Sequence, residues 1–201
     1  MSALELSGTR RCHSWSSRWL APQVGGLLRQ HPKLQVDLIP DSRDFGLTLR
    51  EADIALRLAR PATGGNSVLA RRVGCLPFSA FAAKAHAGQQ NTELPWITYD
   101  DSMAHLPQAK WLAKAARQGG EQAAGLRVHD LETALEAVLA GVGKSLLPNP
   151  VADRIPTLQK LEACFDMFSR EVWLLAHRNR QSVRRVEVVG EWIANLFQDA
   201  G

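Results

Sequence analysis

Apolar residues recur along the chain with two periods, one near 3.6 and one near 2, and the two periods alternate from one end to the other. Residues 16–30 have the helical period. Their apolar positions are Trp19, Leu20, Val24, Leu27 and Leu28. Ser16 or Ser17 is placed to cap this helix, and the pair His31-Pro32 predicts its end. Residues 34–38 then alternate with period 2 and predict a half-buried strand.

The same alternation continues through the rest of the chain. Helices are expected at residues 43–50, 109–118, 131–139 and 182–198. Strands are expected at residues 52–57, 68–73, 78–83, 96–99, 126–129, 145–147 and 172–177, with a loop at 61–66. Asp130 is a typical N-cap, and Gly141 stands where a C-cap is expected. The alternation indicates an α/β fold with mostly parallel strands, and the pattern restarts near Lys84 as if two similar halves followed in series.

The composition is that of an ordinary folded domain. The 201 residues are 45% hydrophobic and 22% charged, with a formal net charge of +4. The arginines are scattered, which favours a solvated surface over a basic stripe that binds phosphates. The apolar runs are far shorter than the roughly 20 residues that cross a bilayer. The N-terminus lacks the apolar region of a signal peptide, so we expect a cytoplasmic location and no membrane partner.

Catalytic and metal-binding motifs are absent from the sequence. It contains no GxSxG, HExxH, P-loop or GxGxxG element, and its six histidines lack metal-ligand spacing. Cys12 and His13 are adjacent, but neighbouring side chains of a strand point to opposite faces. The three cysteines form no CxxC pair, which is typical of reduced thiols. We therefore expect no catalytic residue, no metal ion and no cofactor.

Five segments resemble one known family in their order and spacing. They are Ser17 to Pro22 (SRWLAP) with His31-Pro32, Glu51 to Leu58 (EADIALRL), Leu69 to Phe78 (LARRVGCLPF), Ala140 to Pro148 (AGVGKSLLP) and Glu171 to His177 (EVWLLAH). Each segment alone is a weak signal, but together they cover about residues 14–198. The chain resembles the effector-binding domain of LysR-type transcriptional regulators. It is most similar to the subgroup that includes glycine-cleavage and β-lactamase-induction regulators.

This resemblance implies a fold like that of type 2 periplasmic binding proteins, with two Rossmann-like lobes joined by two crossover strands. Residues 1–81 and 169–201 would form lobe I, and residues 82–168 would form lobe II, with no DNA-binding domain in this chain. The parent regulator would bind DNA through a helix-turn-helix domain, and the effector-binding domain would form a homodimer. A small, anionic effector would bind in the cleft between the lobes and change their closure.

The segment before the first helix departs from the family pattern. The family has a regular strand there that ends at a Ser or Thr of the effector site. In this chain residues 7–14 are more polar and fall several residues short of the usual spacing. Two alternatives stay open: residues 4–7 form that strand and an unusual loop follows, or residues 10–14 form a shortened strand.

Candidate effector contacts follow from where strands and helices end. Ligands of open α/β sheets bind beyond the carboxyl ends of strands, and helix N-termini offer free N–H groups to anions. The relevant positions are the start of the first helix, the end of strand 96–99 and the residues before helix 131–139, together with the residues expected at the floor and mouth of the cleft. The expected effector-binding residues are Ser14, Ser16, Ser17, Arg57, Arg60, Phe78, Tyr99, Ser102 and His129.

Plainer interpretations apply to the same residues, and two other functions compete. The serines can be helix caps, His129 a packed or exposed histidine, Asp100-Asp101 a solvated turn, and Arg57 a surface ion pair. A solute-binding protein of similar fold would need an export signal. A cytosolic enzyme on that fold would need a catalytic constellation, and the sequence shows neither.

Overall fold

Strands and helices alternate along the chain as the hydrophobic pattern predicts. The computed structural model describes residues 2–7, 15–41, 53–60, 67–88, 90–118, 122–162, 167–179 and 183–198. The chain divides into unit 1, residues 1–76 with 170–201, and unit 2, residues 77–169. Two long strands, β4 (Val68–Ala83) and β9 (Phe168–His177), contribute residues to both units.

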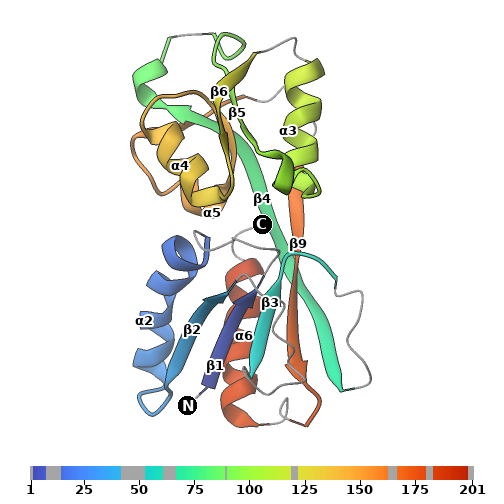
Figure 1. Cartoon of the computed structure of the whole chain (residues 1–201). Coiled ribbons are helices and arrows are strands. Elements are labelled where there is room, and N and C mark those ends of the chain that lie inside the picture. The colour runs from blue at the N-terminus through green and yellow to red at the C-terminus, as the bar shows by residue number, and fades with distance from the viewer. Residues whose placement is uncertain are drawn as a thin grey trace. The chain divides into compact units, whose positions relative to one another are not determined.

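The strands of unit 1 are arranged around β1. β1 (Ser2–Ser7) lies between β2 (Val36–Asp41) and β3 (Ile54–Arg57) and runs parallel to both. β3 pairs with β9 in antiparallel orientation, with Ile54 opposite Ala176. Figure 1 shows this order, from β2 through β1 and β3 to β9. The first strand therefore includes residues 4–7, as the first of the two alternatives predicts, while residues 8–14 lie outside the described part.

The first helix already includes Trp15, which precedes both of its serines. A π-helical turn, η1 (Ser16–Leu20), continues directly into α2 (Ala21–Gln30), which ends at His31. The N-cap position of η1 is Trp15, which makes no capping bond with its side chain. Pro22 is the second residue of α2, which directly follows the π-helical turn.

Aromatic side chains of the C-terminal helix of unit 1 pack against aromatic side chains of this first helix. Phe197 of α6 (Arg184–Gln198) is 2% exposed, and its ring lies 4.9 Å from that of Trp19 and 6.2 Å from that of Trp15. Gly74 of β4 stands against the same phenylalanine, since a Cβ built at Gly74 would lie 2.7 Å from the Phe197 Cβ. A glycine at this position lets the helix approach the strand closely.

Unit 2 contains a pair of parallel strands, a helix that connects them and a second helix that follows them. β5 (Trp96–Tyr99) and β6 (Ala123–Val128) are parallel, and α3 (Pro107–Gln118) connects them. α4 (Leu131–Leu139) follows β6 and leads to β7 (Ser145–Pro148). β7 and β8 (Leu158–Lys160) each pair antiparallel with β4. The short helices are η3 (Lys84–His86), η4 (Asp101–Met103) and α5 (Asn149–Ala152).

The AGVG segment after α4 is explained by two glycines with different requirements. Gly141 has a φ of +77°, the left-handed conformation that commonly ends a helix, which confirms the predicted C-cap region. Gly143 packs against the backbone before β5, because a Cβ built there would lie 2.3 Å from the Pro95 carbonyl oxygen. Lys144 then joins β7 to β5, accepting from the Ile97 N–H at 2.8 Å, and its buried ammonium lies 4.5 Å from the Trp96 ring centre.

Three expectations about strands are corrected. Residues 68–73 and 78–83 are one continuous strand, β4, because Gly74 serves helix packing instead of a turn and Pro77 stands just before the segment paired with β7. The strand expected at 34–38 occupies 36–41, and that expected at 126–129 occupies 123–128. The strands are mixed in direction, since β9, β7 and β8 all join as antiparallel neighbours. The expected helix 43–50 and loop 61–66 lie outside the described residues.

Candidate functional site

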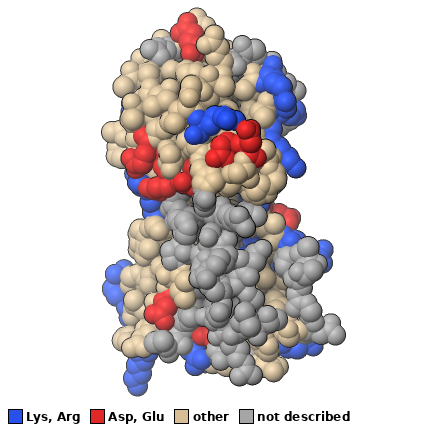
Figure 2. Space-filling model, in the orientation of Figure 1, with Lys and Arg blue, Asp and Glu red and all other residues tan. Residues whose placement is uncertain are grey.

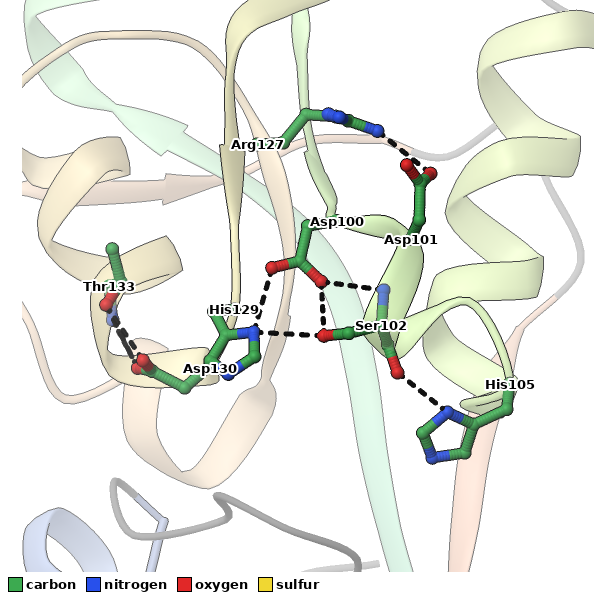
Figure 3. A network of polar contacts seen from close by, with 8 residues as sticks. All are labelled: Asp100, Asp101, Ser102, His105, Arg127, His129, Asp130 and Thr133. Atoms are coloured by element: carbon green, nitrogen blue, oxygen red, sulfur yellow. Dashed lines mark hydrogen bonds and ion pairs between the residues drawn. The ribbon is translucent and has the colours of Figure 1, made fainter.

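The carboxyl ends of β5 and β6 bring two polar segments of unit 2 together. Tyr99 and Val128 are opposite each other in the parallel pair, and the Asp100 N–H donates to the Val128 carbonyl at 2.9 Å. Asp100 and His129 therefore leave the two strands side by side. We call the polar residues that gather there the strand-end cluster (Figure 3): Asp100, Asp101, Ser102, His105, Arg127, His129, Asp130 and Thr133.

Asp100, His129 and Ser102 form the centre of this cluster. Nδ1 of His129 lies 2.8 Å from Oδ2 of Asp100 and 3.2 Å from Oγ of Ser102. The other carboxylate oxygen of Asp100, Oδ1, accepts from the Ser102 hydroxyl at 2.6 Å and from the Ser102 backbone N–H at 3.0 Å. The side chains of His129 and Asp100 are 38% and 33% exposed, so solvent reaches the centre of the cluster.

These contacts assign the protons of the central residues. A carboxylate only accepts hydrogen bonds, so the proton of the His129 ring lies on Nδ1, facing Asp100. The single hydroxyl proton of Ser102 goes to Oδ1 of Asp100, which is its closest acceptor. The second ring nitrogen of His129, Nε2, has no hydrogen-bond partner among the described residues. In the neutral ring this Nε2 is an acceptor.

The same proton assignment argues against a Ser-His-Asp catalytic relay in this cluster. Such a relay needs the carboxylate on one ring nitrogen and the serine hydroxyl on the other, so that the imidazole removes the serine proton. Here Asp100 and Ser102 both face Nδ1, and the Ser102 proton already points to Asp100. The arrangement positions a histidine and does not activate a serine.

The polar side chains at the edges of the cluster bond to one another or to the nearby backbone. Asp130 caps α4, as the sequence predicts, by accepting from the Thr133 N–H at 2.8 Å and from the Thr133 hydroxyl at 3.0 and 3.1 Å. Arg127 and Asp101 form an exposed ion pair of 2.9 Å. Nδ1 of His105 donates to the Ser102 carbonyl at 3.1 Å.

The two remaining predicted residues of unit 2 are buried. Tyr99 is 9% exposed and belongs to the strand that leads into the cluster. Phe78 is 7% exposed and packs edge-on against Phe168 at 5.5 Å. Phe78 stands opposite Pro148 in the antiparallel pair of β4 and β7, so it adjoins the end of β7.

The predicted residues of unit 1 occupy separate positions. Ser16 is 2% exposed, while Ser17 is on the exposed side of the first helical turn. Arg57 is the half-buried last residue of β3, and Arg60, which is exposed, lies 5.5 Å from the ring centre of Trp173. Ser14 lies outside the described residues.

Asn149 is a candidate that the sequence did not reveal. It is the first residue after β7, and its Oδ1 is buried without a hydrogen-bond partner among the described residues. A buried amide oxygen without a partner costs about 1–3 kcal/mol, so a donor is expected here. The rule that ligands meet strand ends could have identified Asn149, which directly follows β7.

The charged residues of the described chain form no single-sign field on the face that Figure 2 shows. Lysine and arginine are interspersed there with aspartate and glutamate, outside the part drawn in grey. Among the described residues no group of three or more His, Cys, Asp or Glu side chains could hold a metal ion. No helix in the same residues has the length and apolar character to cross a membrane.

Arg72, a residue of β4 outside the strand-end cluster, has a shifted pKa. Its guanidinium donates to the Cys75 sulfur at 3.0 Å, and this hydrogen bond, with the nearby charges of Cys75 and Glu171, raises the pKa of Arg72 above its ordinary value. Glu171 lies 3.4 Å away, and both side chains are about half exposed. Arg72 therefore stays charged, and this pair has little effect on stability in solvent.

Known proteins resemble this chain over almost its full length. The Mau operon transcriptional activator of Paracoccus denitrificans is 27% identical over 186 residues, which are 92% of this chain and 62% of the activator. The regulatory domain of CrgA from Neisseria meningitidis has a TM-score of 0.70 at 15% identity, with 100% of both chains covered. The effector domain of AmpR from Pseudomonas aeruginosa has a TM-score of 0.69 at 16% identity and covers 98% of this chain and 95% of its own.

The similar structures support the fold expected from the sequence, an α/β fold of the type 2 periplasmic-binding-protein kind with two Rossmann-like lobes and two crossover strands. The family model of the LysR substrate-binding domain matches residues 12–198. From this match we conclude that the chain belongs to the LysR substrate-binding domain family.

Proposed function

We propose that the chain senses a small-molecule effector and that the strand-end cluster of unit 2 is part of the effector site. One observation carries this proposal: in a LysR substrate-binding domain, polar side chains converge at the carboxyl ends of β5 and β6. Ligands of α/β sheets bind at such ends. His129 and Ser102, which the sequence indicated as effector contacts, both belong to this cluster.

We further propose that the effector carries an anionic group. Two cationic side chains of unit 1 support this, Arg57 at the carboxyl end of β3 and Arg60 three residues later. A guanidinium can bind a carboxylate or phosphate through two parallel hydrogen bonds. Arg60 makes no ion pair with a described residue, and its cation–π contact with Trp173 leaves it exposed.

The larger assembly is also a proposal. The chain spans 62% of the length of the transcriptional activator that it matches, and the proposed parent regulator would carry a DNA-binding part in addition. In that regulator, effector binding would change DNA binding elsewhere in the protein, and pairs of this domain would form a homodimer in the cytoplasm. Sedimentation of the purified chain would test the dimer.

A thermal-shift screen of small metabolites tests the proposed function. A true effector raises the melting temperature, because binding to the folded state stabilises it by RT ln(1 + [L]/Kd), about 2.7 kcal/mol at 100 times Kd. The compound should be recovered unchanged after incubation. If the chain converts the compound chemically, it is an enzyme and the proposal is wrong.

A further inference from the structure

We infer that the strand-end cluster of unit 2 recognises a hydrogen-bond donor of the effector, a hydroxyl or an amine, through Nε2 of His129. The inference rests on the proposed function, since it assigns a chemical preference to part of the same effector site. Asp100 acts here as a positioning residue, because it fixes which ring nitrogen of His129 carries the proton.

The hydroxyl and N–H donors of Ser102 and Thr133, next to His129, are used within the chain. The Ser102 hydroxyl and backbone N–H both go to Asp100, and the Thr133 hydroxyl and N–H both go to Asp130. The Arg127 guanidinium is directed to the Asp101 carboxylate. A ligand acceptor, such as a carboxylate oxygen, would have to compete with these bonds.

Two hydrogen-bond acceptors of unit 2, by contrast, have no donor among the described residues. Nε2 of His129 has no partner among the described residues, and the ring is partly exposed. Asn149 of the same unit gives an independent indication, because within the described part of the chain its buried Oδ1 also lacks a donor. Each of these atoms would be satisfied by an N–H or O–H group from a ligand.

The charges of the cluster point in the same direction. Asp100 contacts His129 and Asp130 follows it in the chain, so two carboxylates lie near this ring (Figure 3), while the positive charge of Arg127 is paired with Asp101. A ligand carboxylate would be repelled at this position. A neutral hydroxyl would not be repelled, and an ammonium would be attracted.

The first test measures the ring protons directly. Long-range ¹H–¹⁵N NMR of the 201-residue chain, at a pH where the rings are neutral, distinguishes protonated from unprotonated nitrogens. We expect His129 to carry its proton on Nδ1. His177 is the internal control, because its Nδ1 accepts from the Asn179 N–H at 3.2 Å and its proton should lie on Nε2. If His129 has the same tautomer as His177, the inference is overturned.

The Asp100→Asn variant tests the positioning role in the same spectra. An amide can present either an oxygen or an NH₂ group to Nδ1, so the preference for one His129 tautomer should weaken. The His177 tautomer should not change. An unaltered His129 tautomer in Asp100→Asn would show that Asp100 does not position the ring.

The second test compares matched probe compounds by titration. Succinate is compared with malate and aspartate, and propionate with lactate and alanine, so that only a hydroxyl or amine is added. The donor-bearing member of a pair should bind roughly tenfold more tightly, as expected for a hydrogen bond to a waiting acceptor. In His129→Phe this difference should disappear. It should persist in His177→Phe, which replaces a histidine of β9 outside the cluster.

The outcomes separate this inference from the proposed function. Equal binding of the members of every pair, or binding of none of them, overturns the inference. So does a preference that survives in His129→Phe. A compound without a donor that stabilises the wild-type chain would leave the proposed function in place, while the absence of any stabilising compound in the metabolite screen would count against the function itself.

Discussion

His129 and Asp100 contact each other at 2.8 Å because each is the first residue beyond a directly opposed pair, Tyr99 and Val128, in two parallel strands. Parallel strands deliver their carboxyl ends to the same edge of a sheet, so the contact follows from the strand register. The next residue, Asp130, turns away to cap α4. Two consecutive residues thus have different roles: His129 belongs to the centre of the cluster, and Asp130 caps the helix that follows.

Removing the Asp130 cap should weaken unit 2. Asp130→Ala leaves the Thr133 N–H without its acceptor, and the free energy of unfolding should fall by about 1 kcal/mol. Asp130→Asn keeps an acceptor oxygen and should retain most of the stability. Urea unfolding followed by circular dichroism measures both values. Asp101→Ala is the control, because its side chain is 91% exposed, and its change should stay below about 0.5 kcal/mol. A cap variant as stable as this control would contradict the assignment.

A methyl group at Gly143 should be poorly tolerated. The added Cβ would lie 2.3 Å from the Pro95 carbonyl oxygen, so the backbone before β5 must move, at a cost of about 1–3 kcal/mol or more. Gly125→Ala is the matched control, since nothing lies within 4 Å of a Cβ built there. Thermal unfolding should show a clear loss for Gly143→Ala and none for Gly125→Ala. Equal melting temperatures would show that Gly143 is not needed for close packing.

Truncating Phe197 should destabilise unit 1 strongly. The ring is 2% exposed and packs against Trp15 and Trp19, so Phe197→Ala should cost about 3–5 kcal/mol in the free energy of unfolding. Phe197→Leu keeps much of the volume and should cost less. Chemical unfolding monitored by tryptophan fluorescence reports the change. Leu28→Ala, at a side chain 37% exposed, provides the comparison and should have a small effect. A loss for Phe197→Ala no greater than that comparison would be inconsistent with its packing.

The sequence predicted the elements of the site better than their contacts. Strand ends near Tyr99 and Val128 and the Asp130 cap follow from local periodicity and capping preferences, which depend on nearby residues only. The contact between Asp100 and His129 depends on the register between two strands that are 24 or more residues apart in sequence, and single-sequence patterns do not fix it.

The sequence-based predictions were wrong where tertiary packing, and not local preference, decides the conformation of a residue. Gly74 and Pro77 have the character of a turn, yet Gly74 accommodates Phe197 and β4 continues through both. The serines of the first helix have the character of caps, yet Trp15 before them is already helical. Asn149 was missed because an unsatisfied acceptor is visible only after the surrounding side chains are placed.

The central claim is that a small effector binds at the strand-end cluster, and one measurement tests it most directly. The effector found in the metabolite screen is titrated into the wild-type chain, His129→Phe and Asp37→Asn, and the shift in melting temperature is measured at each concentration. We predict a shift in the wild type and in Asp37→Asn, an exposed residue of β2 outside the cluster, and a loss of at least tenfold in apparent affinity in His129→Phe. The same shift in all three proteins would contradict the account, because the effector would then bind away from His129.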